Sequence, residues 1–540
     1  MRIIGFNGND DSGVTLLEDG KIISAINEER LNRIKLYQGF PEKSLDMVLS
    51  KNNLKPDDIH KVVVTGYMSK KPILKDYIKK LIHTSPAYSY YLIGRLKYLN
   101  YVKNHQFKKD FATAKKMFPN AEITSVDHHL AHASSAHFTS GRNKNLIITA
   151  DGHGDGLSNG AYLGNGTNIE RIHYSSDIDS LGYYYGRITV ALGFKFHRHE
   201  GKVTGLAAYG RPTEKLMELM KSMIVFDKQT MSFKSKVGFN YIPSSDVSDT
   251  FINFISKFNK EDVAASLQLH LHKIVTEYIE ALIDENGHSN IVLSGGVFAN
   301  VKLNQRIKEV NGVKSIFIHP NMGDGGLGMG GALFIHNETY PVNIKLNNVY
   351  FGNEYSDKEI KIVLDNHHLN YKYHKDPSYV VAELLAKGKV IGRFDGRMEY
   401  GARALGNRSV LYQTTDKSVN DWLNKNLARS EFMPFAPVTI SKFANKCYKN
   451  LKGAEYAAKF MTITFDCTDC MKETSPAVVH VDDTARPQLI DEKTNPKYFK
   501  IVDEYRKITG IPSLINTSFN MHEEPIVCSP EDAIKSFRQG

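Results

Sequence analysis

Two histidines and one aspartate have the spacing of a metal site. His128 and His132 stand four residues apart in the segment 127–133 (DHHLAHA), and on a helix such side chains point the same way, so that both imidazoles can bind one cation. Asp151 follows the apolar run 146–150, which predicts a buried strand that delivers its carboxylate into a glycine-rich turn. The alternative is a histidine-rich helix start whose imidazoles are packed in the core, because a lone H-x-x-x-H pattern is weak evidence.

Glycine-rich segments later in the chain have the composition of phosphate-binding turns. Lys202 lies among small residues in 199–210 (HEGKVTGLAAYG), which suits a backbone close to a phosphate, although a tight helix crossing has the same composition. Asp324 is the only acid in the segment 319–331, so we expect it to face a ligand or a metal. The turns after two predicted strands supply the expected nucleotide contacts Gly295, Gly296, Asn300, Gly323 and Gly325.

A second chemistry, based on arginine, follows in the last third of the chain. The segment 392–409 (GRFDGRMEYGARALGNRS) has four arginines among small residues, which is the arrangement expected for an oxyanion or phosphate pocket. The segments 480–487 (HVDDTARP) and 516–520 (NTSFN) add hydrogen-bond donors at the ends of predicted strands. Surface arginines are usually solvated charge, but the glycine and alanine around these arginines argue against that alternative.

Two hairpin patterns would position the first group of residues. Residues 1–30 alternate as a β-hairpin whose polar turn contains Asp10, and the same pattern returns over 146–172. A strand, a polar glycine turn and a returning hairpin, used twice, predict a duplicated domain. In the actin, hexokinase and chaperone-ATPase (ASKHA) superfold, two such turns hold nucleotide phosphates by backbone N–H groups.

Length and composition predict a soluble α/β protein with at least two domains. The chain has 540 residues, 41% hydrophobic and 24% charged, which is too long for one ordinary core. Glycine density falls near 337–346, which predicts domains at 1–340 and 345–540. No apolar run is long enough to cross a membrane, and the N-terminus reads as a strand instead of a signal peptide, so the expected location is the cytoplasm. The C-x-x-C pair Cys467 and Cys470 has no second pair nearby, so we expect ordinary thiols.

The net charge of +10 is concentrated in one segment. Residues 70–116 contain twelve Lys and Arg against two Asp, interleaved with tyrosine and phenylalanine. One interpretation is a helical hairpin whose aromatic rings are core and whose lysines are solvated. The other is a surface for a polyanion with stackable rings, such as single-stranded nucleic acid.

With these motifs in order, the chain resembles the NodU/CmcH-type O-carbamoyltransferases. The resemblance is carried by HHLAHA, GKVTGLAAYG, SGGVFAN, GDGG, GRMEYGARALGNRS, HVDDTARPQ and NTSFN. It implies an actin-like (ASKHA) N-terminal domain and a YrdC-like α/β C-terminal domain. It also implies that carbamoyl-adenylate is formed from carbamoyl phosphate and ATP, and that the carbamoyl group is then transferred to an acceptor hydroxyl at an iron site.

The resemblance assigns roles residue by residue. The implied metal ligands are His128, His132, Asp151 and Asp324, with Fe(II) or another divalent transition metal as the ion and Mg²⁺ accompanying ATP. The implied catalytic residues are Asp10, Asp151, Arg403 and Arg486. The implied nucleotide and adenylate contacts are Lys202, Asn300, the four turn glycines, Arg397, Arg403, Arg408, Arg429, Thr484, Arg486, Asn516 and Asn520. The sequence departs from the family pattern at Asn9, where the family has histidine, at Ala402, where it has proline, and at Asp483 and Glu523, where it has glycine.

Two other classes of function remain open at this point. One is an ATP-dependent kinase or hydrolase of the same superfold, which has no need of an H-x-x-x-H site or an arginine-rich second domain. The other is a non-catalytic nucleic-acid-binding relative, suggested by residues 70–116. For the carbamoyltransferase, the expected partner is a hydroxyl-bearing acceptor, either a small molecule, a sugar or a hydroxylated nucleotide in nucleic acid, and the sequence is compatible with a homodimer.

Overall fold

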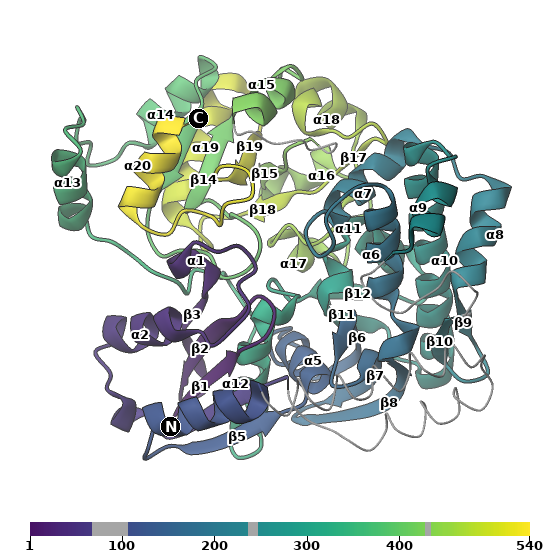
Figure 1. Cartoon of the computed structure of the whole chain (residues 1–540). Coiled ribbons are helices and arrows are strands. Elements are labelled where there is room, and N and C mark those ends of the chain that lie inside the picture. The colour runs from purple at the N-terminus through teal and green to yellow at the C-terminus, as the bar shows by residue number, and fades with distance from the viewer. Residues whose placement is uncertain (67–105, 236–246, 427–433, 540) are drawn as a thin grey trace.

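Two five-stranded sheets with the same topology form the first part of the computed structural model, which describes residues 1–66, 106–235, 247–426 and 434–539 (Figure 1). The first sheet has the order β3-β2-β1-β4-β5 and the second the order β8-β7-β6-β11-β12. In each, a hairpin of three antiparallel strands is followed by two parallel strands. The repeated order confirms the duplication predicted from the two hairpin patterns.

The strand bounds are close to those expected. The first sheet consists of β1 (Arg2–Asn7), β2 (Gly13–Glu18), β3 (Lys21–Asn27), β4 (Lys61–Thr65) and β5 (Glu122–Val126). The second consists of β6 (Lys144–Gly154), β7 (Leu157–Asn165), β8 (Asn168–Ser176), β11 (Asn290–Ser294) and β12 (Ser315–Ile318). One expectation was wrong: the chain does not leave the strand at Asp151, because β6 runs on to Gly154 with an irregular register after Ala150. The turn is therefore short, at Asp155 and Gly156, which both have positive φ.

Two helices pack against each other between the sheets. These are α5 (His128–Phe138) and α12 (Leu327–Asn337). The helix α12 packs on strands of the first repeat, and α5 packs on strands of the second. Their close approach depends on glycine, because a Cβ on Gly330 would overlap the carbonyl oxygen of Ala131, and a Cβ on Gly328 would press on Gly5. Part of the glycine in 319–331 therefore serves helix packing and not phosphate binding.

Further helices surround the two repeats. They are α1 (Glu29–Asn32), α2 (Glu42–Lys51), α6 (Leu181–Ala191), α7 (Glu200–Leu206), α8 (Glu214–Met223), α9 (Asp249–Ile255), α10 (Lys260–Asn286) and α11 (Val301–Glu309), with the small hairpin β9 (Ile224–Asp227) and β10 (Ser232–Ser235). The longest of the described helices is α10. It begins at the N-cap Asn259, whose side chain accepts from the backbone N–H of Glu261, and ends at Gly287 in the left-handed conformation.

A third sheet, of order β13-β14-β19-β15-β18, forms the C-terminal domain, which lies in the green to yellow part of Figure 1. Its strands are β13 (Ile391–Phe394), β14 (Arg408–Tyr412), β15 (Pro437–Ile440), β18 (Gln488–Ile490) and β19 (Ser513–Ser518), and β16 (Phe465–Asp466) pairs separately with β17 (Thr484–Ala485). The helices are α13 (Asp357–Asn366), α14 (Ser378–Ala386), α15 (Val419–Asn426), α16 (Ala444–Cys447), α17 (Glu455–Ala458), α18 (Asp469–Thr474), α19 (Pro496–Thr509) and α20 (Pro530–Gln539). With the duplicated α/β part before it, this domain completes the two-part α/β organisation expected from the sequence.

Direct contacts hold the two parts together. Arg30 donates to the carbonyl oxygen of Gly401 at 2.9 Å, Asn304 donates to that of Thr462 at 2.8 Å, and Tyr456 stacks on Phe317 with ring centroids 4.6 Å apart. These contacts join elements that are far apart in sequence. No helix in the described ranges is both long and apolar enough to cross a membrane.

Candidate metal centre and basic cavity

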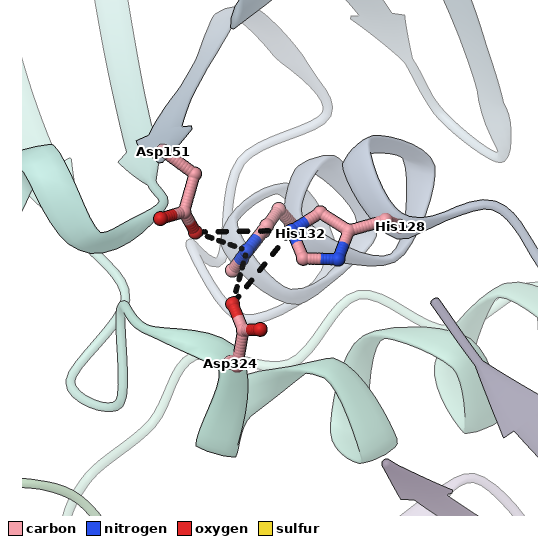
Figure 2. A group of neighbouring side chains, drawn as sticks. All are labelled: His128, His132, Asp151 and Asp324. Atoms are coloured by element: carbon pink, nitrogen blue, oxygen red, sulfur yellow. Dashed lines mark hydrogen bonds and ion pairs between the residues drawn. The ribbon is translucent and has the colours of Figure 1, made fainter. Parts of the chain in front are cut away.

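His128, His132, Asp151 and Asp324 meet between the two repeats (Figure 2). Nε2 of His132 lies 3.1 Å from Oδ2 of Asp151 and 3.5 Å from Oδ1 of Asp324. Nε2 of His128 lies 3.8 and 3.7 Å from the same two oxygens. All four candidate ligand atoms lie within 4.8 Å of one another. The structure thus brings together the four residues that the sequence predicted as metal ligands.

The local structure of α5 aims both imidazoles at this point. Asp127 caps the helix by accepting from the backbone N–H of Leu130 at 3.0 Å, and Asp155 accepts from that of His128 at 2.8 Å, so two carboxylates bind the free amides of the first turn. Nδ1 of His132 lies 3.0 Å from Oγ of Ser294, at the end of β11. This bond fixes the ring orientation and leaves Nε2 facing the two aspartates, as is usual for a metal-binding histidine.

The electrostatics of the cluster suit a cation. Burial raises the pKa of Asp324 well above its usual value, and the carboxylates of Asp151 and Asp10 raise it further. Burial also raises the pKa of Asp151, but the neighbouring imidazoles of His128 and His132 outweigh burial and hold that pKa well below its usual value. Nε2 of His128 is buried and has no hydrogen-bond partner among the described residues. Two imidazoles, two crowded carboxylates and an orphaned nitrogen aimed at their centre fit a divalent transition metal.

Asp10 lies close enough to this cluster to interact with it electrostatically. Burial raises the pKa of Asp10 and Asp151 raises it too, while His197 and His128 lower it. Its Oδ1 accepts a hydrogen bond from Nε2 of Gln38. Asp10 is therefore near the cluster without being one of its four members, and its catalytic role stays a prediction.

A second site, a cavity of about 340 Å³, lies between the two domains. Its lining includes six residues predicted to contact the nucleotide or adenylate, namely Lys202, Arg403, Thr484, Arg486, Asn516 and Asn520. It also includes Lys35, Arg198, His199 and His522, which the sequence reasoning did not select. Basic side chains from both domains thus surround one space, which is the charge pattern that a phosphorylated substrate needs.

A buried lysine missed by the sequence reasoning supports this cavity. Nζ of Lys302, in α11, donates to Asp482 and to Oγ1 of Thr484 in the C-terminal domain. Oγ1 of Thr484 in turn donates to Oδ1 of Asp482 at 2.7 Å. Burial lowers the pKa of Lys302, and the Asp482 carboxylate opposes that effect. One signal could have revealed Lys302. It lies in the first turn of a helix, where the helix dipole disfavours a positive charge.

Several predicted contacts lie elsewhere. Arg408 is fully buried and donates to the backbone carbonyls of Asp395, Asn407, Asn353 and Gly396 at 2.9 to 3.2 Å. Arg397 donates to the carbonyls of Ile23 and Phe351 at 2.8 and 2.7 Å. Asn300 caps α11 by accepting from the N–H of Leu303. These three side chains are not part of the cavity lining and bind other groups of the fold, so their contact with a nucleotide stays a prediction.

The turn glycines also divide into two groups. A Cβ on Gly295 would overlap the backbone of Ala150, and one on Gly325 would overlap the side chain of Asn27, so both are needed for packing. A Cβ on Gly296 would lie 3.1 Å from Oδ1 of Asp151, beside the metal cluster, whereas none of the described atoms lies within 4 Å of one on Gly323. Arg429 lies outside the described residues.

The comparison with protein families decides the identity of the chain. The model described as "Carbamoyltransferase N-terminus" matches residues 2–333, and "Carbamoyltransferase C-terminus" matches residues 382–540. The chain belongs to the carbamoyltransferase family. It is therefore an enzyme that transfers carbamoyl groups, and the expected resemblance is confirmed.

Curated relatives of this carbamoyltransferase extend over nearly all of its length. An uncharacterized protein of Methanocaldococcus jannaschii is 34% identical and covers 99% of this chain and 96% of its own length. The nodulation protein NolNO of Sinorhizobium fredii is 31% identical over 98% of this chain and 76% of its own. Nodulation protein U of the same organism is 24% identical over 97% and 94%. Among solved structures, HypF in a phosphate- and nucleotide-bound form matches 64% of this chain and 56% of its own, at 14% identity and a TM-score of 0.32.

Proposed function

We propose that this enzyme is an ATP-dependent O-carbamoyltransferase with two linked active sites. The cavity between the domains forms carbamoyl-adenylate, and the carbamoyl group is then transferred to an acceptor hydroxyl at the cluster of His128, His132, Asp151 and Asp324. The observation that carries this proposal is the basic cavity, because a family model for carbamoyl transfer alone does not explain why Lys202, Arg403 and Arg486 line one space.

The chemistry of adenylate formation fits such a lining. Carbamoyl phosphate first loses inorganic phosphate to water, and an oxygen of the resulting carbamate attacks the α-phosphorus of ATP, which breaks the bond to the β-phosphate and releases pyrophosphate. Carbamoyl phosphate, carbamate and ATP are all anions, so the reaction needs charge neutralisation and alignment more than a protein nucleophile. Arg403 and Arg486 can bind phosphate oxygens with two donors each, and Lys202 adds a point charge from the other domain.

Transfer to a hydroxyl requires a base and an electrophile at the second site. His128, His132, Asp151 and Asp324 would hold the ion, and Fe(II), Zn²⁺ and Mn²⁺ all suit this ligand set. When bound, the ion supplies Lewis acidity toward an acyl oxygen or an alcohol. Asp10 is the group we assign to receive the hydroxyl proton, because burial raises its pKa toward the range in which a carboxylate acts as a general base.

The acceptor that we favour is a hydroxyl group on a small molecule or sugar. NolNO and nodulation protein U are relatives of this chain. In addition, residues 106–116, the described end of the basic segment 70–116, argue against a nucleic-acid surface. There, Phe107 and Phe111 pack against the core of the first repeat, and their two ring centroids lie 5.4 Å from each other. Lys108 and Lys109 are exposed. That is the arrangement of a scaffold with solvated lysines; residues 67–105 lie outside the described ranges.

The test separates the two half-reactions. Arg403→Ala should abolish pyrophosphate release from ATP and carbamoyl phosphate, because it removes a phosphate-binding side chain from the cavity. His128→Ala should leave pyrophosphate release largely intact and stop carbamoylation of an acceptor supplied as a mixed sugar and alcohol panel. If His128→Ala removed pyrophosphate release as completely as Arg403→Ala, the proposed division between the two sites would be wrong.

A further inference from the structure

A single carboxylate interrupts the basic lining of the interdomain cavity. Glu523, which follows β19, is the only acid among the described residues that line it. Nζ of Lys195 donates to its two oxygens at 3.0 and 2.9 Å, Nε2 of His199 lies 3.2 Å from Oε1, and Nη1 of Arg198 lies 3.6 Å from Oε2. The two cationic side chains and the imidazole come from the segment between α6 and α7, so the contact crosses from one domain to the other.

The backbone of Glu523 shows that this contact is held against a conformational cost. Glu523 has a φ of 60°, in the left-handed region that favours glycine and is strained for other residues. The side chain of Asn520 fixes the same loop by donating to the carbonyl oxygens of Met521 and Glu524 at 2.7 and 3.0 Å. The hydrogen bond from Lys195 lowers the pKa of Glu523 to about 2, so the carboxylate is ionised at neutral pH.

The groups around Glu523 are those that bind phosphate oxygens. An ammonium and an imidazole lie within hydrogen-bond distance of its two oxygens, and a guanidinium forms a longer ion pair with one of them. All three types of group also bind phosphate oxygens. The Glu523 carboxylate therefore occupies the position in which these groups would bind the oxygens of a phosphate. Without Glu523, Arg198 and His199 would belong to one basic lining with Lys202 and Arg403. Lys195, which contacts Glu523 from outside that lining, would add a further cation beside it.

We propose that Lys195, Arg198 and His199 form a phosphate subsite of the cavity, which binds the pyrophosphate portion of the nucleotide, and that Glu523 occupies this subsite as an internal competitor until the anion displaces it. This inference rests on the proposed function, since it assigns the far end of the same ATP site. Displacement would free Lys195 and Arg198 for the ligand and release the strained loop.

The same residues offer a metal-binding alternative that charge disfavours. Ligand atoms of His199, His522 and Glu523 lie within 4.8 Å of one another. Lys195 and Arg198, however, already contact the Glu523 carboxylate, and two fixed positive charges beside a single acid would repel a divalent cation.

Binding of inorganic pyrophosphate, measured by calorimetry without turnover, tests the proposal. Glu523→Gln should bind it about five- to thirtyfold more tightly than the wild type, because a competitor held by several partly exposed ion pairs is removed. Glu523→Gly, which also relieves the strained φ, should show the same gain. Glu524→Gln is the matched control: its carboxylate contacts Lys535 at 3.4 Å, lies outside the cavity lining, and should leave pyrophosphate binding unchanged. Adding Arg198→Gln to Glu523→Gln should cancel the gain.

Three results would overturn the subsite. The first is that both Glu523 variants bind pyrophosphate no more tightly than the wild type does, which is what a purely structural contact between the domains predicts. The second is an equal gain in Glu524→Gln, which would show a general charge effect. The third is stoichiometric Zn²⁺ binding to the wild type that Glu523→Gln abolishes, which would assign the cluster to a metal. If the wild type binds pyrophosphate but releases none from ATP, the proposed function is wrong, and the phosphate subsite is still supported.

Discussion

Replacing Arg408 with methionine should unfold the C-terminal domain at lower temperature without acting on the chemistry. Its guanidinium is fully buried, donates to four backbone carbonyls and lies 3.8 Å from the ring centroid of Phe394. Each hydrogen bond from a charged donor contributes about 1.5–3 kcal/mol, and the desolvation of the guanidinium opposes that gain. A net loss of about 3–5 kcal/mol is the usual result when one partner of a buried charged contact is removed.

For a domain of this size, such a loss lowers the melting temperature by about 10 °C. The assay is thermal unfolding by circular dichroism, together with pyrophosphate release at a temperature where the variant is still folded. Arg403→Met is the control, because Arg403 lines the cavity and its loss should remove activity with little change in melting temperature. An Arg408→Met protein that melts with the wild type and yet releases no pyrophosphate would refute the reasoning and return Arg408 to the active site.

Three further predictions concern the metal, the pH dependence of stability and the basic segment. Protein purified without chelator should contain about one transition-metal ion per chain by elemental analysis, and His128→Ala/His132→Ala should lose it; a metal-free wild type with full transfer activity would contradict this. Burial and the Glu29 carboxylate raise the pKa of Asp11 from 3.8 to about 7, so the folded state favours the protonated form and the wild type should lose stability, relative to Asp11→Asn, as pH rises from about 4 to about 7. Melting temperatures of both proteins across that range measure this, and parallel curves would count against it. Changing Lys108 and Lys109 to Glu should not alter binding of single-stranded RNA at low salt, whereas a steep, salt-dependent loss would favour a nucleic-acid surface.

Patterns with a fixed period or spacing predicted most of the fold. The duplicated hairpins, the helix between Asn259 and Gly287 and the pairing of His128 with His132 all follow from local sequence, since each depends on residues close together in the chain. The place of Asp324 in the cluster needed a contact across nearly two hundred residues, and only the isolated acid in a glycine-rich segment pointed to it.

Side chains that share a motif were harder to separate. Arg403 and Arg408 stand five residues apart in one arginine-rich segment, yet one lines the cavity and the other binds carbonyl groups of its own loop. Local composition cannot distinguish them, because the difference lies in which backbone groups the third sheet leaves unpaired. Lys302 was missed for a related reason: its partners, Asp482 and Thr484, belong to the other domain.

The measurement that tests the central claim most directly identifies the products formed from ATP in the presence of carbamoyl phosphate. Resolving the nucleotide products by anion-exchange chromatography shows which phosphate bond is broken. Adenylate formation predicts pyrophosphate, with AMP appearing as the adenylate is consumed, and both should depend on carbamoyl phosphate. ADP and inorganic phosphate from ATP, without pyrophosphate, would contradict the account and assign the cavity to a kinase or hydrolase reaction.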